Sequence, residues 1–298
     1  MRYPVERFSV KCGVALFLNG FGQIMFQQSA LTGIFFFIGI CTNSWFMASG
    51  GILGALSGVI TARFLAFKSD EILQGAYGFN GALVGIALIF SYAPGAPSYL
   101  LILLGCAISS VLMNVMLRWR DHLPPLTAPF ILSAWIMLLI AHLSGIEPAS
   151  YSTVPVYRGD VFAVFRGLGQ VMFQDSWIAG IAFSIGLVLH SRHAAAWALI
   201  GSAVGLVAAR SLGYPETLVQ TGIFSFNGVL TGIALGDKFR DNAMMPIVGV
   251  VLSVVIIRGF QSTSIPALTA PFVLSTWVII LVNKLDNLLH RTFPTHLR

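Results

Sequence analysis

Charged residues are scarce in this chain, and their scarcity excludes a soluble domain with a charged surface. Asp, Glu, Lys and Arg together make up 9% of the 298 residues, whereas hydrophobic residues make up 56%. No charged residue occurs between Cys12 and Ala62 or between Ile72 and Leu117. Each stretch is long enough for at least two membrane spans of about 20 residues, and the runs do not alternate as barrel strands do. The composition therefore predicts an all-α, polytopic membrane protein.

Cysteine is also scarce, and clusters of ligand-type residues are missing. The three cysteines, Cys12, Cys41 and Cys106, have no C-x-x-C spacing, so they predict neither a disulfide framework nor a metal site. His190 and His193 have no carboxylate nearby in sequence, which favours a solvated turn over a metal site. The net charge of +6 does not indicate a nucleic-acid partner, because in a membrane protein the distribution of charge matters more than its total.

The sequence repeats itself with a period of about 150 residues. The shift is 147 residues for the first two repeated segments and 142 for the third, and the segments are 22–27 with 169–174, 78–81 with 225–228, and 126–130 with 268–272. This period is far longer than the 20 to 50 residues of a solenoid repeat. The repeated positions are mostly glycines or polar residues inside apolar runs. They predict two related halves, residues 1–147 and 148–298, with a pathway between them.

Each half divides at charged or Pro/Gly-rich breaks into one short apolar piece and five candidate spans. In the first half these segments are 12–29, then 31–49, 50–67, 72–92, 98–117 and 126–145. In the second half they are 161–176, then 177–190, 194–212, 217–236, 243–258 and 268–284. If the short piece enters and leaves on one side, each half crosses the membrane an odd number of times. The second half is then inverted relative to the first.

The distribution of lysine and arginine supports the inverted arrangement. With a cytoplasmic N-terminus, 13 of the 17 basic residues fall inside, and the four outside are Arg158, Arg166, Arg210 and Arg258. A parallel arrangement gives 11 inside and 6 outside. Cytoplasmic loops carry an excess of basic residues, so both termini are predicted to be cytoplasmic, at the inner membrane if the source is Gram-negative. Residues 147–160 are the predicted linker, and no removed signal peptide is predicted at the N-terminus.

Two threonines occupy equivalent, proline-flanked positions. Thr127 lies among three nearby prolines, and Thr269 lies between two. Proline suits the first turn of a helix and disrupts its interior, so each threonine is expected near a helix start. Helix breaks inside a membrane are tolerated where protein or a water-lined cavity meets the freed backbone groups. The duplication favours a pore-facing break over a span that simply begins at the membrane surface.

Two glutamines are each followed by a phenylalanine three residues later. The pairs are Gln23 with Phe26 and Gln170 with Phe173, and on a helix each pair would share a face. An amide offers donors and an acceptor, and the face of an aromatic ring accepts N–H groups weakly. This combination suits a neutral, planar, hydrogen-bonding solute. The alternative is that the glutamines join helices and the phenylalanines face lipid.

Two asparagines and one acid complete the polar candidates. Asn80 and Asn227 are each followed directly by glycine, so a role in close helix packing is expected for them. Asp175 is the one acid deep in an apolar context of the second half, and its counterpart is Gln28. An intramembrane carboxylate is a candidate proton or cation site. It leaves an ion-coupled secondary transporter of another small polar solute open as the alternative, whereas an enzyme lacks clustered acid, base or metal-binding groups.

These repeated motifs resemble the urea transporter family over nearly the whole chain. The pattern Asn-Gly-x-Leu-x-Gly occurs at 80–85 and at 227–232. The pattern Leu-Pro-x-x-Thr-x-Pro-Phe occurs at 123–130 and returns at 265–272 with Ile265 in place of the first leucine. The resemblance implies a homotrimer in membrane lipid. Each protomer then has its own pore between two inverted halves, each built of five helices and one tilted pore helix.

The resemblance further implies channel-type passage of urea and small amide analogues down a gradient through a narrow neutral filter, with no catalysis and no cofactor. The implied site residues are Gln23 and Gln170 as outer and inner polar positions, Phe26, Phe79, Phe173 and Phe226 as slot walls, Leu83 and Leu230 as apolar lining, and Thr127 and Thr269 as the central constriction. Family members often carry glutamate at the position of Gln170, so this chain departs from them there. A neutral filter suits urea, because each polar group left unpaired on dehydration costs about 1 to 3 kcal/mol and uncharged oxygens offset that cost.

Overall fold

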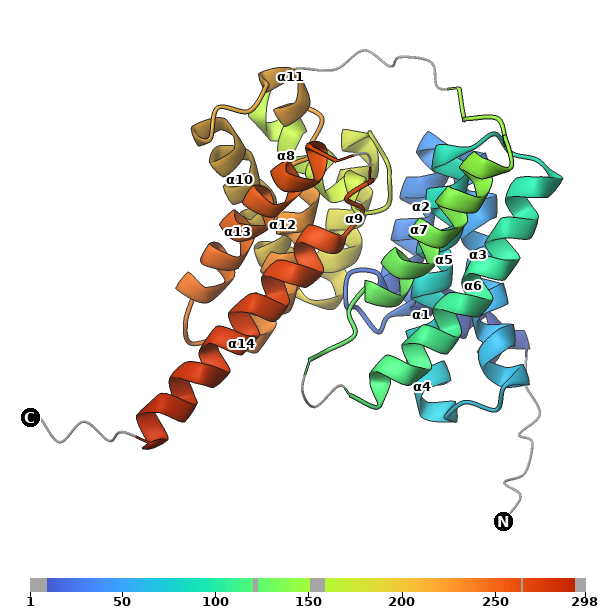
Figure 1. Cartoon of the computed structure of the whole chain (residues 1–298), viewed down its shortest axis with the longest axis horizontal. Helices are drawn as coiled ribbons and strands as arrows, with labels where there is room; N and C mark the ends of the chain where they lie inside the picture. Colours follow the sequence, from blue (N-terminus) through green and yellow to red (C-terminus); the bar gives the residue numbers. More distant parts are fainter. Residues whose placement is uncertain (1–9, 120–122, 151–158, 264, 293–298) are drawn as a thin grey trace, which may run out of the picture.

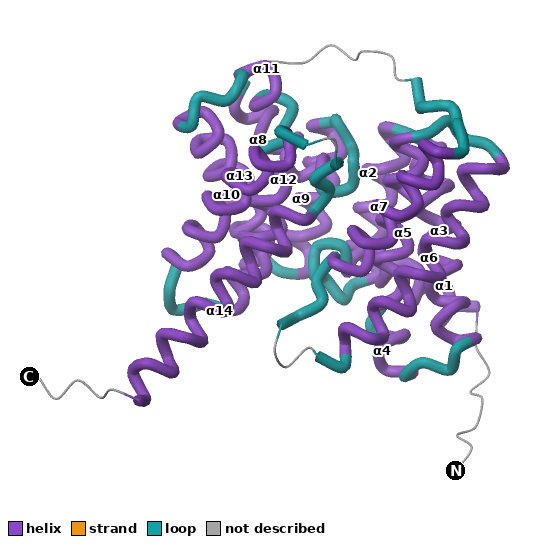
Figure 2. The backbone as a smooth tube through the Cα atoms, in the orientation of Figure 1, coloured by secondary structure: helices purple, strands orange, loops and turns teal. Residues whose placement is uncertain are grey.

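A computed structural model describes residues 10–119, 123–150, 159–263 and 265–292, and within these ranges every regular element is a helix (Figures 1 and 2). This confirms the predicted all-α fold. The helices of the first half are α1 (Val10–Gln23), α2 (Ala30–Asn43), α3 (Trp45–Phe64), α4 (Ser69–Leu73), α5 (Ala76–Ser91), α6 (Ala96–Leu117) and α7 (Ala128–Leu143). Those of the second half are α8 (Asp160–Gln170), α9 (Trp177–His190), α10 (Arg192–Ser211), α11 (Glu216–Val219), α12 (Phe226–Lys238), α13 (Met244–Gln261) and α14 (Ala270–Thr292).

Five of the described helices, α3, α6, α10, α13 and α14, are long and apolar enough to cross a membrane. Four further apolar helices, α2, α5, α7 and α9, are shorter. A full crossing needs about 20 residues, so these shorter helices need the packing of their neighbours at membrane depth. The chain is therefore a membrane protein with both full-length and shortened helices. Most of the predicted linker, residues 151–158, lies outside the described residues, as does Arg158.

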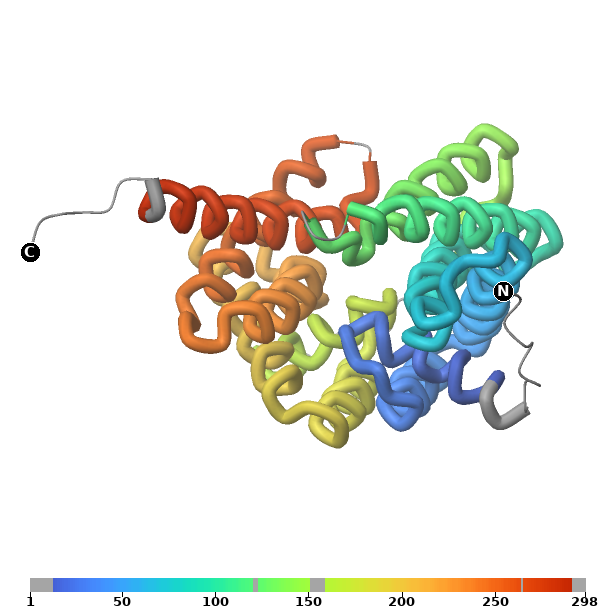
Figure 3. Tube along the Cα trace, turned by 90° about the horizontal axis from the view of Figure 1, so that it is seen from below, coloured from blue at the N-terminus to red at the C-terminus, as the bar shows by residue number. Residues whose placement is uncertain are grey.

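The two halves form helix bundles that lie side by side, and α2 and α9 meet between them (Figures 1 and 3). Phe36 of α2 and Phe183 of α9 face each other with ring centroids 5.1 Å apart. The Thr32 hydroxyl donates to the Gly186 carbonyl at 2.9 Å. The two phenylalanines are related by the 147-residue shift, so equivalent positions meet at the centre of the molecule. In Figure 1, α7 and α14 run in opposite directions.

The boundary expected between segments 31–49 and 50–67 is wrong. The break lies at Ser44, whose hydroxyl accepts a hydrogen bond from the Met47 N–H at 3.2 Å and so caps the first turn of α3. The glycines that suggested a break lie inside α3. A Cβ added at Gly50 would come within 2.6 Å of the Gly85 carbonyl oxygen. Glycine at this position therefore serves close packing of α3 against α5, and it does not end a helix.

The sequence predicted a single span at 72–92 and another at 217–236. The structure shows that neither segment is a single helix. Each consists of a short helix, a turn and a longer helix, namely α4 with α5 and α11 with α12. The turns pass through Gly75 and Gly222, whose φ angles are 82° and 78°. This left-handed region favours glycine, and a Cβ at Gly222 would lie 2.5 Å from the Gly167 nitrogen. The same unusual backbone thus recurs 147 residues apart.

Candidate functional site

Thr127 and Thr269 meet where the two bundles join. Their Oγ1 atoms lie 2.7 Å apart, and both side chains are almost completely buried. Thr127 directly precedes α7 and Thr269 directly precedes α14, which confirms that each threonine lies at a helix start. A hydroxyl carries one donor and two acceptor positions, so their mutual bond uses only one of the two O–H groups. The pair is a neutral contact point with further hydrogen-bonding capacity.

Two asparagines hold the helix starts that carry these threonines. Asn80 Oδ1 accepts a hydrogen bond from the Phe130 N–H at 3.1 Å, and Asn227 Oδ1 accepts one from the Phe272 N–H at 3.0 Å. The first N–H groups of a helix have no partner within the helix. Each asparagine therefore caps a helix from a neighbouring one. This confirms the expected packing role, and the bond also brings the backbone beside each asparagine close to a threonine helix.

Two tryptophans join the halves reciprocally. Trp135 Nε1 donates to the Pro266 carbonyl, and Trp277 Nε1 donates to the Pro124 carbonyl, both at 2.8 Å. Each bond runs from a threonine helix of one half to the loop before the threonine of the other half. The two tryptophans are related by the 142-residue shift, and so are the two prolines. This shift was the only signal for these bonds in the sequence. They fix the two threonine segments against each other.

Phe26 and Phe173 lie in turns and not on helices, so the expectation of a shared helix face with Gln23 and Gln170 is wrong. Helix α1 ends at Gln23 and α8 ends at Gln170. The two phenylalanines then adopt φ angles of 63° and 61°, a left-handed conformation that residues other than glycine rarely take. The Gln27 N–H donates to the Gly22 carbonyl at 3.0 Å and closes the first of these turns.

Each turn phenylalanine contacts a ring from the opposite half. Phe26 and Phe272 have ring centroids 6.0 Å apart at 66°, and Phe173 and Phe130 have centroids 6.4 Å apart at 80°. Edge-to-face pairs in this distance range are favourable. Phe130 and Phe272 each lie three residues after a threonine of the central pair. Two aromatic pairs, one on each side, therefore flank the neutral Thr127–Thr269 contact.

The remaining sequence candidates take different positions. Gln170 Nε2 donates to the Thr221 carbonyl at 3.3 Å, and its side chain is half-buried, as is that of Gln23. Phe79 and Phe226 directly precede the capping asparagines. Leu83 and Leu230, by contrast, are fully buried within α5 and α12. In this conformation the two leucines belong to the packed core and present no open surface.

A family model described as "Urea transporter" matches residues 14–284. The chain belongs to the urea transporter family. Among curated relatives, "Urea transporter 1" of Ovis aries and of Capra hircus are each 29% identical to it over 241 residues, and that of Mus musculus is 28% identical over 242 residues. These matches cover 74% of the chain and 62% of each relative. The chain thus spans about three fifths of the length of the relatives it matches.

In this urea transporter family member, a cavity of about 580 Å³ lies beside Phe26. Among the residues that line it are Leu126, His190, Asp237 and Lys238. These residues come from the ends of α9 and α12 and from the loop before α7. They lie on the side of the molecule where α4 lies (Figure 1). The histidines of the predicted turn thus border a cavity next to a candidate site residue, a position that sequence reasoning missed.

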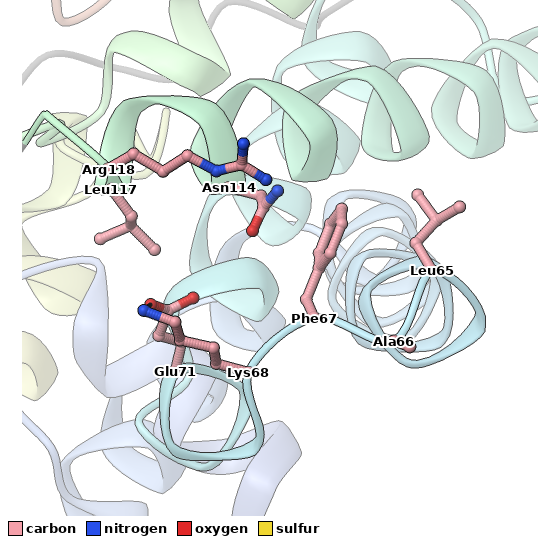
Figure 4. A pocket seen from close by; sticks show the side chains of 8 residues that line it. All are labelled: Leu65, Ala66, Phe67, Lys68, Glu71, Asn114, Leu117 and Arg118. Atoms are coloured by element: carbon pink, nitrogen blue, oxygen red, sulfur yellow. Dashed lines mark ion pairs between the residues drawn. The ribbon is translucent and has the colours of Figure 1, made fainter.

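A second cavity, of about 300 Å³, lies apart from these residues (Figure 4). It lies between the loop that follows α3 and the end of α6, and Figure 4 shows Arg118 and Asn114 on one side with Lys68 and Glu71 on the other. None of the residues lining it is one of the ten site residues implied by the resemblance. The Glu71 carboxylate accepts a hydrogen bond from Tyr77 at 2.7 Å, so this acid has a structural partner.

Asp175 also has a structural explanation. Its Oδ1 lies 3.7 Å from Nε of Arg166, whose side chain is only 4% exposed. Arg166 Nη1 in turn donates to the Gln220 carbonyl at 3.0 Å. Buried charges in proteins are normally paired, so a carboxylate beside this buried arginine is expected without any transported ion. Within the described ranges, no group of three or more His, Cys, Asp or Glu is placed to hold a metal ion.

Proposed function

We propose that this chain passes urea down its gradient across the membrane, through a channel between its two halves, without catalysis and without a cofactor. The observation that carries this proposal is the arrangement at the centre. Phe26 and Phe173, each packed on a ring of the opposite half, flank the hydrogen-bonded Thr127–Thr269 pair. A planar solute fits between aromatic rings, while hydroxyl oxygens meet its N–H groups.

The chemistry of the proposed contacts suits an uncharged amide. The proposed urea-contacting residues are Gln23, Phe26, Phe79, Leu83, Thr127, Gln170, Phe173, Phe226, Leu230 and Thr269. All are neutral at physiological pH. Each urea N–H left without a partner costs about 1 to 3 kcal/mol, which oxygens along the path offset. An ion is rejected, because none of these groups compensates the much larger cost of dehydrating a charge.

The proposal includes an architecture. Residues 1–147 and 148–298 form inverted repeats, with both termini cytoplasmic, and three protomers assemble in the lipid with one pore each. The shared backbone geometry at Gly75 and Gly222 supports the repeat. Native mass spectrometry of the detergent-solubilised protein tests the trimer. A dominant monomer or dimer under conditions that preserve urea flux contradicts it.

From the proposed cytoplasmic termini we also infer on which side of the membrane each glutamine lies. Gln23 ends the helix that leads into the Phe26 turn, and the cavity beside Phe26 is bordered by Lys238, one of the basic residues predicted to be inside. Gln23 is then the inner polar position and Gln170 the outer one. The family resemblance implied the reverse assignment, so the two predictions are incompatible. We follow the distribution of basic residues, because it is a physical property of this chain.

Stopped-flow flux measurements in proteoliposomes test the function. We expect rapid urea equilibration compared with protein-free vesicles, slower passage of N-methylated ureas, and no dependence on a proton or sodium gradient. Urea uptake that collapses when either gradient is dissipated favours the ion-coupled alternative, for which Asp175 was the sequence argument. Urea flux equal to that of protein-free vesicles refutes the proposal.

A further inference from the structure

The two halves differ at one position that faces a turn phenylalanine. Residues 76–91 and 223–238 align without a gap, and both contain Gly-Ile-Ala-Leu at the same place. In this register Phe90 of α5 corresponds to Asp237 of α12. The repeat therefore places an aromatic ring in one half where it places a carboxylate in the other.

The aromatic residue packs directly on a candidate slot wall. The rings of Phe90 and Phe173 have centroids 5.2 Å apart at 43°. Because Phe173 also contacts Phe130, its ring is held by two aromatic neighbours. At the equivalent place in the other half, Asp237 and Phe26 line the same cavity of about 580 Å³.

Other pairs of equivalent positions near the two turns also differ between the halves. Met47 stands in the first half where the second half has Ala194, and Ala194 lines the cavity. Asn43 Nδ2 donates to Gln174 Oε1 at 2.9 Å, next to Phe173, whereas the position of Asn43 is taken by His190 in the other half. Larger or bonded side chains thus surround the Phe173 turn. Beside Phe26, by contrast, lies the cavity of about 580 Å³, whose lining includes His190, Ala194 and Asp237.

We propose that Phe90 is a positioning residue that holds the Phe173 ring and makes the entrance beside Phe173 the more size-selective of the two. This inference rests on the proposed urea channel. It adds which of the two entrances discriminates between solutes by size. A ring braced on two sides resists rotation away from the path, so a solute wider than urea meets a fixed wall. The Phe26 ring has open space beside it and yields more readily to a larger solute.

The test compares urea with N,N′-dimethylurea in proteoliposomes. Added methyl groups change discrimination by roughly 10-fold or more at a close-fitting site. We expect Phe90→Ala to lower the permeability ratio of urea to N,N′-dimethylurea by about fivefold or more while urea itself still passes. Phe90→Tyr, which keeps the ring, should restore the ratio to near the wild-type value. Phe64→Ala is the matched control, because Phe64 is 87% exposed on α3, and it should leave the ratio unchanged.

Stability is followed in parallel by thermal unfolding in detergent. If Phe90→Ala does not fold, Phe90→Leu supplies the same comparison with less lost volume. A folded variant with an unchanged ratio, or one in which both fluxes fall equally, overturns the proposal, since Phe90 then serves packing alone. Wild-type protein that passes no urea refutes the channel function itself, so the two failures are distinguishable.

Discussion

The hydroxyl oxygens of Thr127 and Thr269 lie 2.7 Å apart, although 142 residues separate them in the chain. Each threonine directly precedes a helix. Trp135 and Trp277 donate hydrogen bonds across the boundary to the loops before Thr269 and Thr127, respectively. The contact is therefore fixed from both sides. Its location is set by the meeting of the halves and not by either half alone.

Replacing one threonine should impair transport without unfolding the protein. Thr127→Val leaves the buried Thr269 hydroxyl without its partner, at a cost of about 1 to 3 kcal/mol, and removes a proposed solute contact. We expect urea flux to fall about fivefold or more, consistent with that energy. The double variant Thr127→Val/Thr269→Val should recover thermal stability but not flux. Thr263→Val, in an exposed turn, is the control, and equal flux in all variants removes the threonines from the mechanism.

The capping asparagines should matter for stability. Asn80→Ala and Asn227→Ala each leave a buried helix-start N–H unpaired, and we expect a loss of about 1 to 3 kcal/mol in unfolding free energy, seen as a lower melting temperature in detergent. Asn114→Ala serves as the control, since Asn114 borders a cavity at the end of α6. Similar melting shifts in all three variants contradict a specific capping role.

Replacing a glycine by alanine should have opposite effects at a packed and at an open helix position. A Cβ at Gly54 would overlap the Gly81 carbonyl, whereas a Cβ at Gly259 would meet nothing within 4 Å. Both glycines lie inside helices. Gly54→Ala should sharply reduce the folded yield. Gly259→Ala should be tolerated or add up to about 1 kcal/mol of stability through helix propensity. Fluorescence-detected gel filtration measures both, and equal yields refute this packing role.

Local signals in the sequence predicted much of this fold, but contacts between distant segments needed the structure. Proline spacing was enough to place Thr127 and Thr269 at helix starts, because proline acts on its own backbone. The glycines at 50 and 51 misled the assignment of helix ends, since glycine marks both breaks and close packing. Nothing local indicated a left-handed Phe26, because no glycine stands there and the turn is imposed by its surroundings.

The candidate site shows the same division. The duplication identified Gln23, Gln170 and both turn phenylalanines, but their partners Phe130 and Phe272 were seen only as parts of a motif. The ring contacts join residues that are far apart in sequence, so no spacing rule predicts them. Phe90 was missed for a different reason. The repeat breaks at this position, whereas the motifs that indicated a site lie where the repeat holds.

Acid should weaken a charged cluster at the start of α8. Arg210 donates to Asp160 Oδ2 at 3.0 Å and to Glu216 Oε2 at 3.1 Å. These bonds hold the pKa of both carboxyls below the usual values near 4. Their contribution to stability is full above the unfolded-state pKa and is lost as pH falls through the lower folded-state pKa.

We therefore expect Arg210→Gln to melt below the wild type at neutral pH, by a small margin because the pairs are exposed. The gap should close as the pH falls below about 4. Arg240→Gln removes a different exposed ion pair, the one with Asp237. It serves as the comparison variant in the same melting experiment. A gap that stays constant from pH 7 to pH 3 contradicts an ionic origin.

The crossed tryptophan bonds carry an evolutionary consequence. A half-length ancestor would have offered an indole N–H and a proline carbonyl that do not satisfy each other within one copy, because each bond observed here joins opposite halves. Two such copies packed against each other would have satisfied both groups at once. A chain cut between the halves would leave all four groups unpaired until the two pieces reassociate.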